Sequence, residues 1–198
     1  MRFPRSRARR EDRPASRFVV TAALGELGPG APAHARKSAA RDEAGRVPRY
    51  WLFKSEPEAF SIDDLERDGT TEWSGVRSPQ ARNLMREMKA GDLGFFYHSS
   101  VQPPGIVGIC EVVAEAHPDS TQWNKKSEYY DGSSKRDDPK WWCVDVRFVR
   151  KLPRMIPIDE LRAIPALAFM PLLRRGQRLS VQPVSPQEWE RILDLVDL

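Results

Sequence analysis

The sequence predicts an α+β domain in which about five to six strands form a small mixed sheet, curved or barrel-like, flanked by short helices. Five segments rich in apolar, aromatic and β-branched residues have the length of strands. Short helix signals lie between and after these segments. A doubly wound sheet would require longer, regular helices and a glycine-rich first turn, and the sequence contains neither.

The first predicted strand, residues 49–55, is the most distinctive segment of the chain. It begins with the apolar run Tyr50-Trp51-Leu52-Phe53 and changes abruptly to Lys54, Ser55 and Glu56. The apolar run is typical of a buried strand, and the polar residues at its end are typical of a small binding site. The other strands are predicted at residues 92–99, 105–116, 141–152 and 178–183.

Two of these strands show informative alternation. In residues 92–99, strict alternation puts Tyr97 and His98 on opposite faces, so both line one pocket only if a bulge intervenes. Trp141 and Trp142 are adjacent, so one of them faces inward and the other outward.

Capping signals predict where the helices begin. Ser61 is followed three residues later by Asp64, Ser78 precedes Pro79, and Ser185 opens a capping box. Two further short helices are predicted at residues 157–162 and 168–175. Between residues 117 and 140 the chain is polar, and so long an insertion in a compact domain indicates a functional or mobile loop.

Residues 1–48 are predicted to be a disordered tail, because they are rich in Arg, Ala, Pro and Gly and lack apolar periodicity. Three interpretations remain open: a basic arm that contacts phosphates, a weak targeting peptide, or a mis-annotated start with Val47 as the true initiator. We favour the third. The folded domain is then residues 49–198.

The charge of the chain lies mostly in this tail. The whole chain carries a formal charge of +4, but residues 1–48 hold 11 of the 32 Lys and Arg residues and 5 of the 28 Asp and Glu residues. The domain therefore has 21 basic and 23 acidic residues, a net charge of −2. Bulk charge gives no support for tight nucleic-acid binding by the domain.

The cysteines and histidines do not form a metal-ligand pattern. Cys110 and Cys143 stand alone in strand-like segments, and no paired Cys or Cys/His spacing occurs. We therefore predict no metal and no cofactor, and reduced thiols in a cytoplasmic protein. No apolar stretch approaches the roughly 20 residues of a membrane span, so no membrane association is expected.

The segment of residues 72–83 concentrates groups that suit nucleic-acid recognition. Trp73 offers a stacking face, while Arg77, Gln80 and Asn83 offer planar hydrogen-bonding groups near a helix N-terminus. From the residues alone, packing of Trp73 in the core is an equally good interpretation.

Hydrolase chemistry is the main alternative that the residues raise. Ser55 and His98 with an acid could imitate a catalytic triad, but no G-x-S-x-G elbow occurs. Lys54 with Glu56 could act in acid/base catalysis, yet such a pair is more often a surface ion pair.

Six motifs in order resemble the EVE domain family of the PUA-like superfamily, from about Arg49 to the C-terminus. They are residues 50–57 (YWLFKSEP), 73–77 (WSGVR), 80–83 (QARN), 95–99 (FFYHS), 104–108 (PGIVG) and 179–183 (LSVQP). The resemblance implies a PUA-like β-barrel flanked by helices. It also implies a binding module that takes a modified base of DNA, a cytosine such as 5-methylcytosine or 5-hydroxymethylcytosine, into an aromatic-lined pocket.

Carried over by motif, the resemblance implies a set of pocket residues. They are Lys54, Ser55, Trp73, Gly75, Val76, Arg77, Asn83, Tyr97, His98 and Ser99, with Trp142 and Ser180 in addition. Trp73 is the expected stacking platform, Asn83 or Ser55 would read the base edge, and Arg77 and Lys54 would engage phosphate or a polar modification.

Two other functions remain open beside the reader. The related ASCH domains include amidohydrolases of acylated cytidine, and PUA-like relatives include RNA-binding accessory domains. We expect modified DNA as the partner, with RNA as the alternative, a monomeric protein, and a nuclease as a candidate functional partner.

Overall fold

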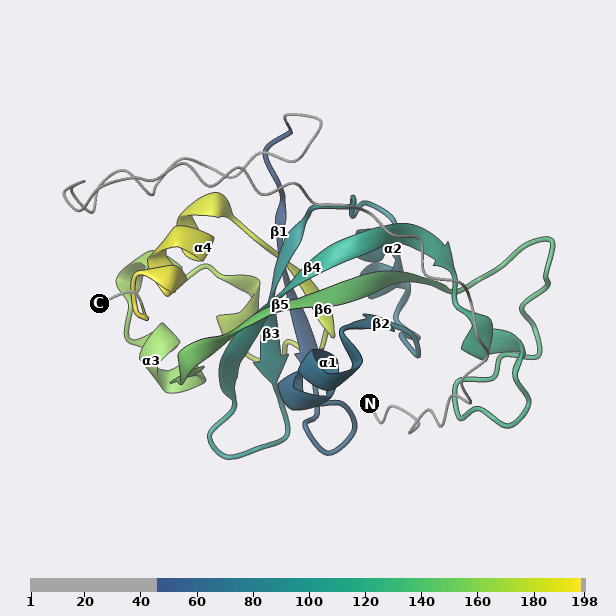
Figure 1. The fold of residues 1–198 in the computed structure, drawn as a ribbon, viewed down its shortest axis with the longest axis horizontal. Coiled ribbons are helices and arrows are strands. Elements are labelled where there is room, and N and C mark those ends of the chain that lie inside the picture. The colour runs from purple at the N-terminus through teal and green to yellow at the C-terminus, as the bar shows by residue number, and fades with distance from the viewer. Residues whose placement is uncertain (1–45, 197–198) are drawn as a thin grey trace, which may run out of the picture.

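A computed structural model describes residues 46–196, and the tail predicted at residues 1–48 therefore lies almost wholly outside the described residues. Within this range, six strands form one mixed sheet in the order β2-β5-β4-β3-β1-β6 (Figure 1). The strands are β1 (Tyr50–Ser55), β2 (Thr70–Glu72), β3 (Leu93–His98), β4 (Gly105–Pro118), β5 (Trp142–Pro157) and β6 (Val181–Val184). The α+β class is confirmed; β2 and β6 are the two edges, so the sheet is open.

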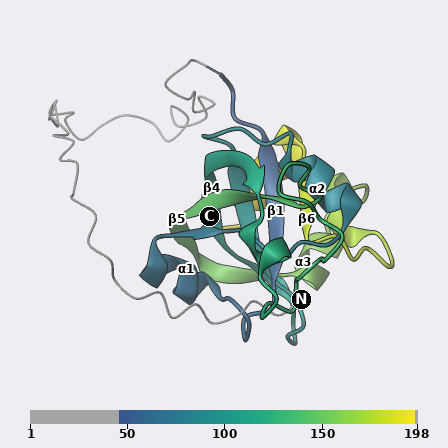
Figure 2. The same cartoon turned by 90° about the vertical axis from the view of Figure 1, so that its right-hand side faces the viewer.

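Helices cover both faces of this sheet. One core cluster contains residues of α1 (Ile62–Asp68) and α2 (Pro79–Met85), and we call this side the α1–α2 face. The other contains residues of α3 (Ile158–Arg162) and α4 (Pro186–Leu193), and we call it the α3–α4 face. Helix α2 lies beside β6, as Figure 2 shows.

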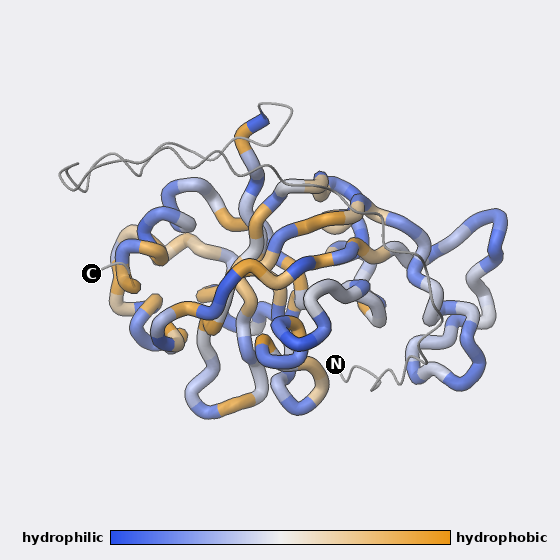
Figure 3. The backbone as a smooth tube through the Cα atoms, viewed as in Figure 1, coloured by the Kyte–Doolittle hydropathy of each residue, from blue (hydrophilic) through white to orange (hydrophobic). Residues whose placement is uncertain are grey.

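Burial on both faces explains the continuous apolar run of β1. Trp51 and Phe53 belong to the α1–α2 core, Leu52 belongs to the α3–α4 core, and all three are fully buried. A strand buried on both sides has no polar face, so its sequence does not alternate. The hydrophobic residues are concentrated along these central strands in Figure 3.

The predicted helix starts are confirmed by the caps. The hydroxyl groups of Ser61, Ser78 and Ser185 each accept a hydrogen bond from a first-turn amide, and the first and third also form complete capping boxes. The helix predicted at residues 168–175 is wrong. The chain forms one 3-10 turn there, η4 (Pro171–Leu173), which follows another, η3 (Pro165–Leu167). Met170 precedes a proline and adopts an extended ψ of 130°, so no helix continues through it.

Two strands of the sheet are longer than predicted, and one strand was not predicted at all. Strands β4 and β5 continue to Pro118 and Pro157, and several register shifts bend them along each other. The edge strand β2 has three residues, two of them threonines, which is too short for an alternating pattern. At the start of the described chain Arg46, predicted to lie in the tail, donates to Asp92 at 2.7 Å.

Residues 119–141 extend beyond one end of the sheet, away from α3 and α4 (Figure 1). They contain the 3-10 helix η2 (Ser120–Trp123), and most of the segment is hydrophilic in Figure 3. None of the helices formed by residues 46–196 is long and apolar enough to cross a membrane.

Candidate functional site

The ends of β1, β3 and β6 bring four polar side chains to the α3–α4 face. Lys54 pairs in register with Tyr97, and the Lys54 amide donates to the Ser180 carbonyl at 2.7 Å. Gln182 pairs with Leu52, two residues before Lys54, so it lies on the same face. We call Lys54, Tyr97, Ser180 and Gln182 the strand-end cluster.

Lys54 carries the only cationic group of this cluster, and its charge is only weakly compensated. Its Nζ lies 5.7 Å from the centre of the Tyr97 ring and donates one hydrogen bond, 3.3 Å long, to the Gln177 carbonyl. No carboxylate among residues 46–196 forms an ion pair with it. Burial lowers the pKa of the ammonium group. Two of its three N–H donors are therefore available to an acceptor from outside the chain.

Tyr97 and Gln182 add further polar groups under Lys54. Tyr97 is only 2% exposed, and burial raises its pKa to about 12, so the phenol stays protonated as a donor. The Gln182 amide donates to the Leu179 carbonyl at 3.0 Å, while its Oε1 is buried without a hydrogen-bond partner among the described residues. A buried acceptor without a donor is uncommon in folded proteins, which makes Gln182 a candidate for ligand contact.

An arginine loop borders the strand-end cluster. Gln177, which accepts the Lys54 hydrogen bond, lies between Arg174, Arg175 and Arg178, and all three arginines are exposed. Their guanidinium groups form no hydrogen bond or ion pair within the described part of the chain. Four cationic side chains thus gather at one rim of a domain whose overall charge is slightly negative.

Ser55 and His98 lie on the opposite face, against α1. The Ser55 hydroxyl is buried and donates to the Phe60 carbonyl at 2.7 Å. The His98 Nε2 accepts from the Ile62 amide at 3.1 Å, and burial lowers the pKa of the ring. Ser99 donates to the Ser55 carbonyl. In this arrangement Ser55 makes its hydrogen bond to backbone and not to His98, so no nucleophile–base pair is assembled.

Arg77 joins the 73–77 segment to residues 119–141. It donates to Asp119 and to Thr121 Oγ1, both at 2.8 Å, and to the Tyr129 carbonyl, and it lies over the rings of Tyr129 and Trp141. Burial alone would raise the pKa of Asp119, but hydrogen bonds from Arg77, Thr121 and the Gly75 amide keep it below its usual value. The Arg77 donors, which the resemblance assigned to phosphate or a polar modification, are thus used within the protein.

Gly75 is required by this arrangement. Its φ is +79°, and a Cβ at this position would lie 2.7 Å from the Tyr129 ring. A side chain here would therefore be strained and would collide with the segment that Arg77 holds.

Trp73 and Val76 lie in the α1–α2 core. Trp73 is fully buried, and Phe53 and Phe96 pack edge-on against it at centroid distances of 5.1 and 5.6 Å. Val76 is 1% exposed. The predicted stacking role requires an open ring face, and Trp73 has none here because the sheet and α2 enclose it.

Asn83 lies on α2 and Trp142 begins β5. These two elements contact each other, and both residues lie away from the strand-end cluster. Asn83 is exposed on α2, and its Oδ1 accepts from Arg82 at 2.9 Å. Trp142 is partly buried, donates to the Pro139 carbonyl at 3.1 Å and lies under Arg86. The structure therefore separates the predicted pocket residues. Lys54, Tyr97 and Ser180 meet on the α3–α4 face, Ser55, His98 and Ser99 meet against α1, and the others lie in the core, around Asp119 or on the surface beside α2.

Sequence reasoning missed Gln182, the arginine loop and Asp119. Gln182 stands in one of the quoted motifs, and alternation from Ser180 would have placed it on the same face. Arg174 and Arg175 end a predicted helix that does not form, and Arg178 follows it, so their loop was not anticipated. Asp119 is 44 residues from Gly75, and no local pattern connects two such positions.

Comparisons with known proteins give a consistent result. Residues 49–195 match the EVE domain family. Mouse thymocyte nuclear protein 1 is 48% identical over 165 residues, which cover 74% of this chain and 73% of the mouse protein. A crystal structure of human THYN1 in complex with DNA containing 5-methylcytosine is 44% identical, with a TM-score of 0.72, over 76% of this chain and 98% of that one. A crystal structure of a Pseudomonas syringae protein is also 44% identical, with a TM-score of 0.71, over 74% of this chain and 98% of that one.

These relatives correct one expectation. The cysteine content suggested a cytoplasmic protein, but the mouse, human and rat relatives are named nuclear proteins. Reduced thiols are compatible with either compartment, so cysteine usage had no power to distinguish them.

Proposed function

Because this chain belongs to the EVE domain family, we propose that it binds DNA that contains a modified cytosine, with 5-methylcytosine as the first candidate. The observation that carries the proposal is the human relative, 44% identical and of the same fold, whose structure contains 5-methylcytosine DNA. The nuclear names of the mouse and human relatives are compatible with a DNA partner.

Within the chain, the proposal assigns recognition to the strand-end cluster. Lys54 supplies N–H donors for a phosphate oxygen or for the O2 and N3 acceptors of a flipped cytosine. Gln182 Oε1 is an acceptor, and the exocyclic N4 amino group of cytosine is a donor. Gln182 Oε1 is covered in this structure, so a base would reach it only after the side chains above it move.

The arginine loop supports the same assignment. Arg174, Arg175 and Arg178 lie beside the carbonyl that Lys54 contacts, and a phosphate backbone is the partner that unpaired guanidinium groups on a rim suit best. Since the domain as a whole has a net charge of −2, its affinity must depend on this local patch. We expect binding that weakens steeply with salt.

Selectivity for the modification should be moderate. A single methyl group in an apolar pocket contributes roughly 1–3 kcal/mol of discrimination, which is about 10- to 200-fold in affinity. Extraction of the base from the stack costs a few kcal/mol, which the contacts in the pocket must offset.

The decisive experiment is a binding series on the full chain with matched oligonucleotides. Fluorescence anisotropy would compare single- and double-stranded DNA carrying one cytosine, 5-methylcytosine or 5-hydroxymethylcytosine, and the ribo-oligonucleotide of the same sequence. We expect the highest affinity for 5-methylcytosine DNA. Equal affinity for modified and unmodified DNA would overturn base recognition, and preference for the ribo-oligonucleotide would favour an RNA-binding accessory domain.

Two lysine variants would test the site. Lys54→Met should weaken binding to 5-methylcytosine DNA by about tenfold, which corresponds to about 1.4 kcal/mol. Lys89→Met is the matched control, because Lys89 is exposed near the opposite end of the same strands and pairs with Glu115. If the two variants bind alike, the strand-end cluster is not the binding site.

A further inference from the structure

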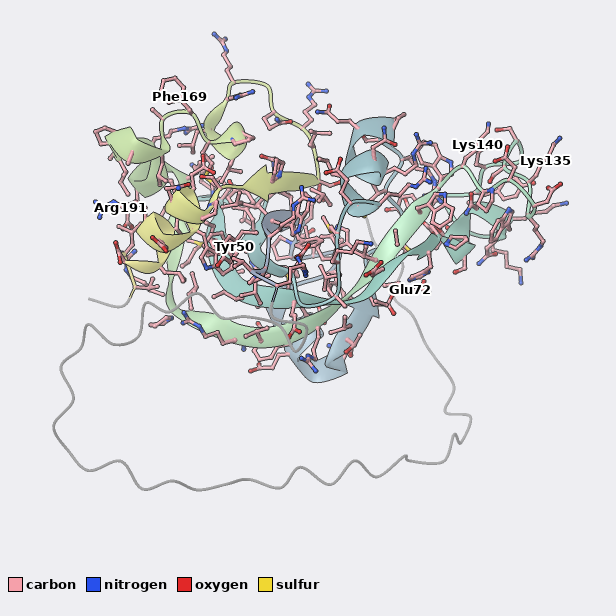
Figure 4. The ribbon with its side chains drawn as sticks, turned by 90° about the horizontal axis from the view of Figure 1, so that it is seen from above. Tyr50, Glu72, Lys135, Lys140, Phe169 and Arg191 are labelled. Carbon is pink, nitrogen blue, oxygen red and sulfur yellow. The ribbon has the colours of Figure 1, made fainter. Side chains whose placement is uncertain are left out.

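A second group of polar side chains lies on the sheet, at the end away from α3 and α4. Glu72 ends β2, Asp145 lies directly opposite it on β5, and His117 comes from β4. One ligand atom from each of the three lies within 4.8 Å of the others, and His117 Nε2 is 2.9 Å from Asp145 Oδ1. Figure 4 shows Glu72 at the side of the sheet, between its body and the segment that carries Lys135 and Lys140.

The sheet register produces this grouping. Trp73, Val144 and Val146 point into the α1–α2 core, so alternation turns Glu72 and Asp145 to the other face. The pairing of β4 with β5 shifts between Ala114 and His117, and this irregularity brings His117 over the same face. The α3–α4 core contains no residue from this end of the strands, so Glu72 is exposed and His117 and Asp145 are partly exposed.

No lysine or arginine of residues 46–196 forms an ion pair with the two carboxylates of this group. The Glu72 carboxylate forms no hydrogen bond or ion pair within residues 46–196, and the Asp145 carboxylate contacts only His117. Arg77, which follows β2 as Glu72 ends it, forms its ion pair with Asp119. Two carboxylate oxygens and an imidazole nitrogen thus converge at one point of the sheet, and such atoms are the ligands of a dication site.

We propose that Glu72, His117 and Asp145 bind a divalent first-row transition metal ion of the zinc class. Carboxylate oxygens and an imidazole nitrogen bind Zn²⁺ at about 2.0–2.2 Å, and the present spacing allows all three to reach one ion with small side-chain rotations. The imidazole favours zinc, nickel or copper over Mg²⁺ and Ca²⁺, which prefer oxygen alone. A metal there joins three neighbouring strands immediately before the Trp73–Arg77 segment.

The proposal does not depend on DNA binding, and it is tested without DNA. Untagged full-length protein is stripped with a chelator and titrated with ZnCl₂ by calorimetry. We expect Glu72→Gln and His117→Gln each to weaken zinc affinity at least tenfold. The matched control is Glu115→Gln, which removes an exposed carboxylate from the same strand as His117 but one that pairs with Lys89; it should change affinity less than twofold.

A second measurement separates binding from folding. Zinc should raise the melting temperature of the wild type and of Glu115→Gln, and should leave that of Glu72→Gln unchanged. Because Glu72 is exposed and its carboxylate forms no hydrogen bond or ion pair within residues 46–196, Glu72→Gln should fold as well as the wild type when zinc is absent. Zinc affinity that is the same in all four proteins, or competition by equimolar Mg²⁺, would overturn the site.

Discussion

Lys54 and Arg77 are both cations that lie beside aromatic rings, but the protein uses them in opposite ways. Arg77 donates hydrogen bonds to Asp119, Thr121 and the Tyr129 carbonyl, and its guanidinium group lies over the rings of Tyr129 and Trp141. Lys54 donates one long hydrogen bond and has no carboxylate partner in the described chain. A cation whose donors are satisfied holds the fold together, whereas one with unused donors at a rim is free to bind a ligand.

The difference also separates two segments that the family resemblance joined in one pocket. The Trp73–Arg77 segment is a structural junction between the core and residues 119–141. The strand-end cluster is a set of polar groups that the fold leaves incompletely satisfied. Substitutions should therefore affect stability in the first region and binding in the second.

Trp73→Ala should give the largest effect. Removal of a fully buried indole from between Phe53 and Phe96 should lower the free energy of unfolding by about 3–5 kcal/mol, measured by urea denaturation. A variant of wild-type stability that had lost DNA binding would return Trp73 to the stacking role predicted from the sequence, and would remove the distinction between the two regions.

Arg77→Met should destabilise the protein by about 3 kcal/mol. The substitution leaves Asp119, which is buried, without its ionic partner, and the partial exposure of Arg77 puts the loss at the lower end of the range for broken buried pairs. Arg82→Met is the matched control, since Arg82 bonds only to Asn83 and the Lys140 carbonyl near the surface. Equal losses of stability in both variants would mean that the Arg77–Asp119 ion pair contributes no more than a surface arginine does.

Lys54→Met should show the reverse pattern. We expect a free energy of unfolding within about 0.5 kcal/mol of the wild type, because a partly buried ammonium without a carboxylate partner contributes little to stability. The tenfold loss of affinity for methylated DNA would then be a binding effect. A loss of stability comparable to that of Arg77→Met would show that Lys54 is structural as well.

Substitution of Arg174, Arg175 or Arg178 by Gln should have a smaller effect on binding at low salt. Each guanidinium that neutralises one phosphate should, when removed, reduce the slope of log affinity against log salt by about 0.7–0.9. Arg191→Gln, an exposed arginine on α4, provides the comparison. An unchanged slope in all three loop variants would exclude the arginine loop from the DNA contact.

Acid titration should give the smallest signal, because other carboxylates titrate in the same range. The pKa of Asp119 is lowered in the folded state, so its contribution to stability is fully present above the unfolded value near 3.8 and is lost as the pH falls through the folded value. Asp119→Asn should therefore lose stability less steeply than the wild type below about pH 4. Parallel curves for the two proteins would show that Asp119 is not held as an anion by Arg77.

The helix starts and the central strands were predictable because their signals are local. A serine cap before an acidic residue predicts a helix start, and a run such as Trp51-Leu52-Phe53 predicts a buried strand. Both patterns are complete within a few residues. Strand β2 and the two 3-10 turns were not predicted, because three residues carry too little pattern and Pro171 overrides the helix propensity of its neighbours.

The candidate site was predicted only in part. Alternation correctly separated Tyr97 from His98, and the abrupt change at Lys54 correctly marked a polar strand end. The grouping of Lys54 with Gln182, of Arg77 with Asp119, and of Glu72 with His117 joins residues that are 42 or more positions apart. No local pattern contains such pairings.

The sequence by itself determined the fold class, the family, the helix caps and the residue types available for binding. Only the tertiary structure decided which cations are neutralised and which keep free donors. The physical reason is that hydrogen-bond satisfaction depends on which distant groups the sheet register brings within about 3 Å. Trp73 and Lys54 were expected in one pocket. Trp73, which follows β2, packs on the α1–α2 face, whereas the alternation of β1 turns Lys54 to the other face beside Tyr97.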